Sequence, residues 1–294
     1  LDWANSSLLF GQTWHPMFVA ECYADVYNFN TGAPFQPFSR NPQIRFSTKG
    51  KVKIIAAAMS QRDFASRGPN PSTGVAEQSS AFLRNAVIPN LHGQLQFGNE
   101  KVTAGAGVDY KAIKPRLKDL KGNKTDETVA GLSYIAYLKV KAGKMTWKVE
   151  GTYGENLADH IMIGGIAETG IDSTSGAYSY SPIGVASVWT ELMGGNDKME
   201  WGLFVGYAKN LGTDKPLVGS MYAFQGSVDN AMRIAPRIGW KSGKMKIGCE
   251  LEYTAAQYGK FAKGTSEVNV KNEDGSEIEA VSNIRGLLIA MYSF

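Results

Sequence analysis

The sequence predicts an all-β fold, a transmembrane antiparallel β-barrel, from three observations. Short turns with Gly or Asn alternate with long polar stretches, the segments between them alternate apolar and polar residues, and these segments are longer than soluble strands. A spanning helix needs about 20 consecutive apolar residues, and no such run occurs in the 294 residues. A helical membrane protein is therefore excluded. A membrane barrel is not, because only every second residue of its strands must be apolar.

Two kinds of connection divide the chain. Most of the tight turns contain Gly or Asn, which suit the backbone of short hairpins; they lie at 4–6, 49–51, 98–100, 142–143, 194–197 and 242–243. The long polar stretches lie at 62–86, 115–127, 156–179, 210–228 and 259–279. Because the two kinds alternate, all long loops lie at one end of the sheet. Outer-membrane barrels have this arrangement, with short periplasmic turns and long external loops.

These connections predict twelve strands in the chain. We expect them near 6–14, 40–49, 51–61, 87–98, 101–113, 128–141, 144–155, 181–193, 197–209, 228–241, 244–257 and 280–294. The strands at 51–61 and 181–193 alternate poorly, so their placement rests on the turns beside them.

The alternation assigns the two faces of the sheet. Near the C-terminus, apolar residues stand at every second position, namely Met245, Ile247, Cys249, Leu251 and Tyr253. Such a face is the core of a soluble sheet or the lipid-facing side of a barrel. Aromatic residues near strand ends on this face favour the barrel, because rings at these positions meet the lipid headgroups; they are Trp147, Tyr153, Trp201, Tyr207, Trp240 and Tyr253. Charged and Gly residues on the other face fit a water-filled interior.

Composition excludes several other classes of protein. The net charge of +4 comes from 31 basic and 27 acidic residues spread along the chain, so no nucleic-acid partner is expected. Cys22 and Cys249 lie far apart and are expected to be free thiols. His15, His92 and His160 are widely separated, and no spacing resembles a zinc site, so no metal or cofactor is expected. A barrel phospholipase needs a His on its outer face, and His92 is assigned to the inner face, so no catalytic residues are expected.

The end of the chain carries a recognisable pattern. The last strand, 283–294, ends in Phe294, with Tyr292 two residues earlier and further apolar residues before it. This resembles the C-terminal signature of bacterial outer-membrane barrels. The resemblance implies a location in the outer membrane of a Gram-negative bacterium, in contact with its lipid and lipopolysaccharide.

Motifs near the start indicate a family. Leu9–Trp14 reads Leu-Phe-Gly-Gln-Thr-Trp, and Gly-Ala-Pro-Phe at 32–35 and Arg-Asn-Pro-Gln-Ile-Arg at 40–45 follow it. These residues resemble the trimeric DcaP-like porins and their relatives in Bacteroidetes. The resemblance implies sixteen strands, a homotrimer, and a third external loop folded into the channel.

The sequence predicts twelve strands, whereas the porins that it resembles have sixteen, which implies that four N-terminal strands are missing. On this interpretation, residues 1–294 form one barrel domain, Leu1–Trp3 end a preceding strand, and 15–39 is the constriction loop. The start without Met or a signal peptide is consistent with a processed or truncated chain. A complete twelve-stranded barrel remains the alternative, since barrels of this size are allowed.

The expected lumen carries eight basic and five acidic wall residues. These are Arg45, Lys53, Lys111, Lys148, Arg233, Arg237, Lys246 and Arg285, with Asp109, Glu150, Glu200, Glu250 and Glu252. Basic residues opposite loop acids would create a transverse field that sets ion preference. The candidate constriction residues are Arg40, Arg45, Arg233, Arg237 and Arg285, opposite Glu21 and Asp25. The alternative is that each is only a solvated lumen charge.

Aromatic residues recur in the second half of the proposed constriction loop. Phe29, Phe35 and Phe38 are expected to pin this loop to the wall, and the alternative is an apolar contact for solutes. The predicted function is passive diffusion of small hydrophilic solutes and ions through a charge-lined pore, with a mild preference for anions or zwitterions and without catalysis. The alternatives are a substrate-selective channel with 15–40 as its binding loop, a structural barrel subunit of an outer-membrane assembly, and an enzyme barrel.

Overall fold

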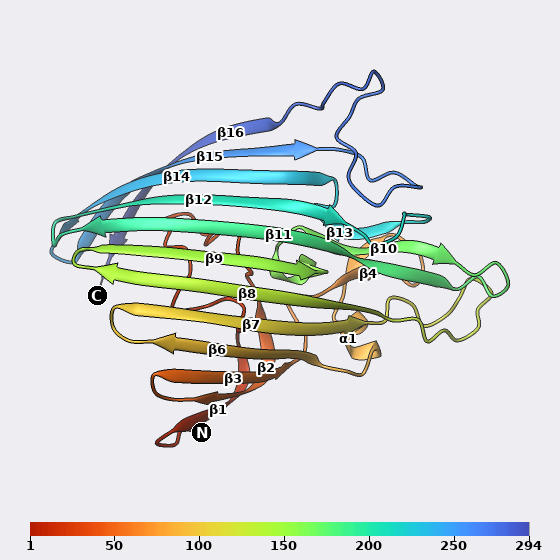
Figure 1. Cartoon of the computed structure of the whole chain (residues 1–294), viewed down its shortest axis with the longest axis horizontal. Helices are drawn as coiled ribbons and strands as arrows, with labels where there is room; N and C mark the ends of the chain where they lie inside the picture. Colours follow the sequence, from red (N-terminus) through yellow and green to blue (C-terminus); the bar gives the residue numbers. More distant parts are fainter. Residues whose placement is uncertain (294) are drawn as a thin grey trace.

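A curved antiparallel sheet dominates the computed structural model, which describes residues 1–293 and leaves Phe294 of the C-terminal pattern outside the described residues (Figure 1). Within 1–293, twelve strands follow one another along the sheet in sequence order. They are β1 (Ser6–Trp14), β2 (Arg40–Thr48), β3 (Val52–Met59), β6 (Asn90–Gly98), β7 (Val102–Ile113), β8 (Val129–Ala142), β9 (Met145–Glu155), β11 (Tyr178–Gly195), β12 (Met199–Gly212), β14 (Val228–Ser242), β15 (Met245–Tyr258) and β16 (Val281–Tyr292). Each corresponds to a predicted strand, with boundaries that differ by at most three residues.

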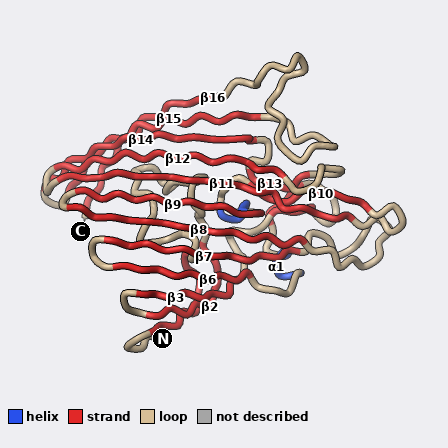
Figure 2. Tube along the Cα trace, in the orientation of Figure 1, coloured by secondary structure: helices blue, strands red, loops and turns tan. Residues whose placement is uncertain are grey.

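Short and long connections lie at opposite ends of the sheet, as the sequence predicts. Figure 2 shows the hairpin turns at one end and the long loops at the other. Gly143 and Gly243 occupy two of the turns with φ of 59° and 58°, a conformation that glycine adopts without a steric penalty. Both chain ends lie toward the turn end (Figure 1).

The long loops contain short elements that the sequence analysis did not predict. They are β4 (Arg67–Pro69), β5 (Ala76–Gln78), α1 (Ala81–Asn85), the 3₁₀ helix η1 (Leu157–His160), β10 (Gly164–Ile171) and β13 (Met221–Phe224). β10 pairs with both β11 and β13, so two loops that are distant in sequence join into one structure. Within the described residues, no helix is long and apolar enough to cross a membrane.

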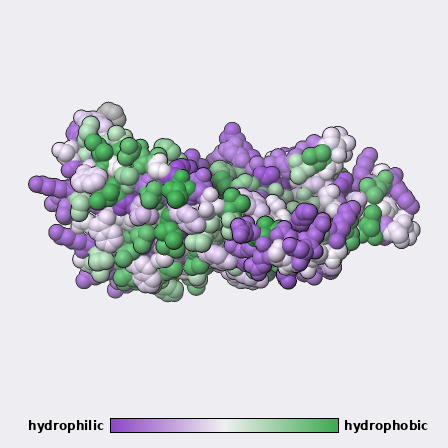
Figure 3. Space-filling view, turned by 90° about the horizontal axis from the view of Figure 1, so that it is seen from above, coloured by the Kyte–Doolittle hydropathy of each residue, from purple (hydrophilic) through white to green (hydrophobic). Residues whose placement is uncertain are grey.

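The two faces of the sheet have opposite polarity, and the polar face is the buried one. On the outer face, Leu95 and Ile247 remain 47% and 52% exposed. On the inner face, Gln94, Arg237 and Glu250 are buried. Figure 3 shows hydrophobic residues gathered over the left half of the molecule, whereas hydrophilic residues form its far left tips and much of its right half. The apolar side chains therefore face outward, as in a barrel surrounded by lipid.

The path of strands begins with β1 and ends with β16. Within residues 1–293, these two strands are not paired with each other. Most residues of β16 are exposed on both faces of the sheet. The described strands therefore form a curved wall around an interior that segment 15–39 enters from the loop end.

The middle of β6 tests which face meets hydrocarbon. We expect Leu95→Arg to lower the free energy of unfolding in lipid vesicles by about 2–4 kcal/mol if this position lies at the bilayer midplane. Gln96→Arg is the matched control, because residue 96 lies on the inner face near the Glu21 carboxylate. The measurement is the folded fraction against urea, followed by heat-modifiable migration on gels. Equal losses in the two variants would contradict the assignment of faces.

Candidate functional site

Segment 15–39 joins β1 to β2 and lies against the inner face of the sheet. Wall carboxylates accept hydrogen bonds from its main chain. The Asp25 N–H donates to both carboxylate oxygens of Glu191 at 3.1 Å. The N–H groups of Tyr27 and Asn28 donate to Glu250 at 2.7 and 3.2 Å. These charge-assisted bonds satisfy backbone donors that would otherwise be shielded from water.

Wall cations bind the carbonyl groups of the same segment. Lys139 donates to the Glu21 carbonyl at 2.8 Å, and Lys148 donates to the Tyr23 carbonyl at 3.0 Å. Further along, Arg233 donates to the Ala33 carbonyl at 2.8 Å. Wall charges of both signs thus hold the segment through its main chain.

The same wall charges also pair with one another. Glu191 accepts hydrogen bonds from Arg237 at 2.7 Å and from Lys148 at 3.0 Å. Glu252 lies 3.3 Å from Arg233 and 2.9 Å from Arg285. Burial of a charge is costly unless it is paired and hydrogen-bonded, and this network meets both conditions.

Apolar packing adds to the polar contacts. Phe35 is 1% exposed and packs against Phe204 at a ring-centroid distance of 6.1 Å. Phe38 packs edge-on against Trp14 at 5.0 Å. Phe29, by contrast, is 98% exposed. Of the three phenylalanines, Phe35 and Phe38 therefore pack as the pinning interpretation expects, and Phe29 does not.

Cys22 belongs to the same buried apolar cluster as Phe35. It is fully buried, and its thiol faces the carbonyl oxygens of Leu138 in β8 and Val149 in β9 at 3.6 and 4.0 Å. Burial raises the pKa of the thiol to about 12, so the reactive thiolate is scarce at neutral pH. Cys22 therefore reports whether the segment is docked on the wall.

The candidate loop acids have partners other than the candidate arginines. The Glu21 carboxylate pairs with Lys53 at 3.2 Å. Burial raises the pKa of Glu21, but the charge and hydrogen bond of Lys53 outweigh burial and hold that pKa below its ordinary value. Asp25 is exposed and contacts the wall through its main-chain N–H. The sequence predicts that Glu21 and Asp25 lie opposite Arg233, Arg237 and Arg285. In the structure these arginines pair instead with the wall carboxylates Glu191 and Glu252.

Two candidate arginines, Arg40 and Arg45, belong to β2. Arg40 is exposed, and its guanidinium lies 4.2 Å from the centre of the Trp14 ring. Arg45 donates to the Trp14 carbonyl at 3.1 Å. Both lie beside the point where segment 15–39 begins and ends.

Glu191, the carboxylate that binds the segment and two wall cations, was not among the residues predicted from the sequence. Its strand, β11, alternates poorly because the inner face also carries the buried apolar residues Ile183, Val185 and Trp189, which pack within the interior. The position of Glu191, two residues after Trp189, places both side chains on the same face and was the available signal.

The three histidines, widely separated in sequence, lie together at the root of the segment. The His15 ring is 5.7 Å from the His92 ring and 4.6 Å from the His160 ring. Asp109 lies between His15 and His92, with its Oδ2 at 3.4 Å from His15 Nε2 and 3.2 Å from His92 Nδ1. Their spacing in the sequence does not resemble a metal site, because the fold alone brings these residues together.

His160 links this cluster to a second loop. Ser39 hydrogen-bonds to His160 Nδ1 at 3.1 Å, and Lys111 pairs with Asp159. Burial lowers the pKa of His160 to about 3, so this ring is neutral at physiological pH. The end of segment 15–39 is thus tied to η1, which belongs to another loop.

Solved structures of outer-membrane proteins are similar in fold to this chain. No family model and no curated protein matches the chain. The channel DcaP of Acinetobacter baumannii superposes with a TM-score of 0.66 at 15% identity, over 98% of this chain and 71% of that one. OmpT of Vibrio cholerae superposes with a TM-score of 0.55 at 10% identity, over 99% of this chain and 78% of that one. The chain therefore has a fold similar to those of these two bacterial outer-membrane proteins, and this fold with its apolar outer face fits the expected outer-membrane location.

The docked position of segment 15–39 can be tested by labelling Cys22. In a Cys249→Ser background, we expect a maleimide to react slowly with Cys22. Glu191→Ala should raise the rate about tenfold or more, because it removes the Asp25 N–H acceptor and leaves two buried cations without their carboxylate. Mass spectrometry of the labelled fraction measures the rate.

The control for this labelling experiment is Glu21→Gln. Its pair with Lys53 is partly exposed, and such pairs contribute about 0–1 kcal/mol, so the rate should change little. Rapid labelling of Cys22 in the parent protein would show that the segment does not rest on the wall.

Proposed function

We propose that the chain forms a pore for passive diffusion of small hydrophilic solutes and ions, with segment 15–39 as its constriction. The observation that carries this proposal is the binding of this segment to charges on the inner wall, namely the carboxylates Glu191 and Glu250 and the cations Lys148 and Arg233. Because the segment lies against the inner face of the wall, it would narrow the proposed pore. The channel fold of the solved structures supports the same role.

The proposed lining follows from exposure. Glu21 and Asp25 are exposed on the segment, Arg40 is exposed on β2, and Arg285 is half-exposed on β16. Arg233 and Arg237 are buried and paired, so their proposed role is to hold the constriction rather than to meet solutes. Arg45 lies near Glu21 and contributes to the field on that side.

The proposed barrel must close. A sheet in hydrocarbon cannot keep an open edge, because unpaired backbone groups find no water there. Pairing β1 with β16 would give twelve strands, whereas four additional strands between them would give the sixteen of the DcaP-like porins. We favour sixteen strands, with a homotrimer as the assembly; one of the similar structures is a trimer form of OmpT. Outer-membrane lipid and lipopolysaccharide are the proposed surroundings.

One observation favours a substrate-selective channel as the second candidate. Phe29 is 98% exposed on the segment, next to Asn28 and Asn30. An exposed ring beside amide groups suits contact with a sugar or an aromatic solute. In this case Phe29→Ala should abolish current block by the preferred solute while it leaves KCl conductance nearly unchanged.

Ion selectivity tests the proposed lining. In planar bilayers under a tenfold KCl gradient, we expect the double variant Asp25→Asn with Glu21→Gln to shift the reversal potential in the direction of greater anion selectivity. Arg285→Glu should shift it toward cations. We expect each shift to be about 10 mV, a fraction of the roughly 59 mV of a perfectly selective pore.

The control for these recordings is Lys244→Glu. It changes an exposed charge in the turn between β14 and β15, at the opposite end of the sheet from the loops. Its reversal potential should stay within error of the parent. Folded variants with conductance but unchanged selectivity would contradict the proposed lining, and a folded protein without conductance would contradict the pore.

A further inference from the structure

We propose that His15, His92 and Asp109 form a site for a divalent transition-metal ion of the zinc class. The ligand atoms of the three side chains lie within 4.8 Å of one another, and all three residues are buried. Two of the separations, 3.4 and 3.2 Å, are near the spacing expected for ligands about 2.0–2.2 Å from one tetrahedral ion. Two imidazoles and a carboxylate are a donor set that suits such an ion.

The ligands come from three elements. His15 follows β1 directly, whereas His92 in β6 and Asp109 in β7 are paired neighbours across the ladder. An ion at this point would join the root of segment 15–39 to the wall. The proposal is independent of what passes through the pore, because it concerns only these side chains.

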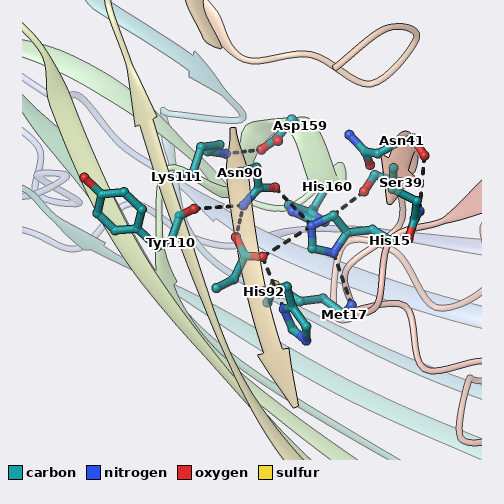
Figure 4. A network of polar contacts seen from close by, with 12 residues as sticks. His15, Met17, Ser39, Asn41, Asn90, His92, Tyr110, Lys111, Asp159 and His160 are labelled. Atoms are coloured by element: carbon teal, nitrogen blue, oxygen red, sulfur yellow. Dashed lines mark hydrogen bonds and ion pairs between the residues drawn. The ribbon is translucent and has the colours of Figure 1, made fainter. Parts of the chain in front are cut away.

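Neighbouring groups orient two of the ligands. Asn90 donates to Asp109 Oδ1 at 2.6 Å, which leaves Oδ2 toward the histidines. Gln94 Oε1 lies 3.0 Å from His92 Nε2, so that nitrogen carries a proton and Nδ1 is the ligand atom. Second-shell contacts of this kind fix the tautomer of metal-binding histidines. Figure 4 shows the side chains of His15, Asn90 and His92 close together.

A fourth ligand is available beside the three. Asn90 Oδ1 lies 3.1 Å from His15 Nε2, where it could complete a tetrahedral set. The alternative is a water molecule in the fourth position, as in sites with three protein ligands. In both cases the Asn90 side chain supports the site.

Metal binding changes the protons of the cluster in a defined way. Without metal, His15 Nδ1 accepts the Met17 N–H at 3.1 Å, so His15 Nε2 carries the proton that faces Asp109. To bind metal through Nε2, the ring takes its proton at Nδ1 and gives up the Met17 contact. Any proton on His92 Nδ1 leaves to solvent. One backbone hydrogen bond is exchanged for bonds to the ion.

Zinc titration of the folded protein tests the proposal. After removal of metal with EDTA, we expect calorimetry and elemental analysis to show one zinc ion per chain. His92→Ala and Asp109→Asn should weaken binding by about 100-fold or more, and Asn90→Ala by about 10- to 100-fold. Cobalt in place of zinc should give the visible absorption of a tetrahedral site in the parent and lose it in His92→Ala.

The matched control is His160→Asn, which removes a buried histidine of the same cluster outside the proposed ligand set. It should retain one zinc ion per chain. Gel migration with and without heating checks that each variant is folded, and the parent stoichiometry decides the matter if a variant does not fold. A folded parent that binds no zinc, or a folded His92→Ala that binds it as tightly as the parent, would overturn the proposal. The cluster would then be only a set of hydrogen bonds and ion pairs between segment 15–39 and the wall.

Discussion

Hydrocarbon offers no hydrogen bonds, and this constraint governs the structure. Each backbone group at membrane depth must find a partner in the sheet, so the chain crosses as long paired strands. Because side chains alternate along a strand, one face meets lipid and the other faces inward. Leu95 and Gln94 are neighbours in β6, yet the apolar side chain is exposed and the polar one is buried. Apolar side chains therefore face outward and polar side chains inward, the reverse of a soluble protein, because the surrounding medium is lipid.

The charged interior creates a second requirement, which segment 15–39 helps to meet. Carboxylates and cations removed from bulk water need partners, and main-chain N–H and carbonyl groups of the segment supply them. Glu191 shows the coupling most clearly, because it binds Arg237, Lys148 and the Asp25 N–H together. The same contacts neutralise the wall and position the segment, so the proposed constriction is part of how the interior is stabilised.

The sequence predicts the strands well and the interior poorly, for one physical reason. Turn residues and alternation are local, and they locate β1 and β2 to within one residue. Contacts across the interior depend on which strands face one another, and no local pattern encodes them. Glu191 was hidden by apolar neighbours that face inward, and the cluster of His15 and His92 spans three elements. The short strands β10 and β13 were missed because their pairing joins separate loops.

Which face of the pleat meets lipid can be measured directly on β8. Nitroxide labels placed singly at residues 132 to 137 would report collisions with oxygen, which concentrates in hydrocarbon. We expect frequent collisions at Leu132, Tyr134 and Ala136, which are exposed, and few at Ser133, Ile135 and Tyr137, which are buried. Few collisions and restricted motion at residues 132, 134 and 136 would mean that these side chains pack in a dry core, and would contradict the assignment of this face to lipid.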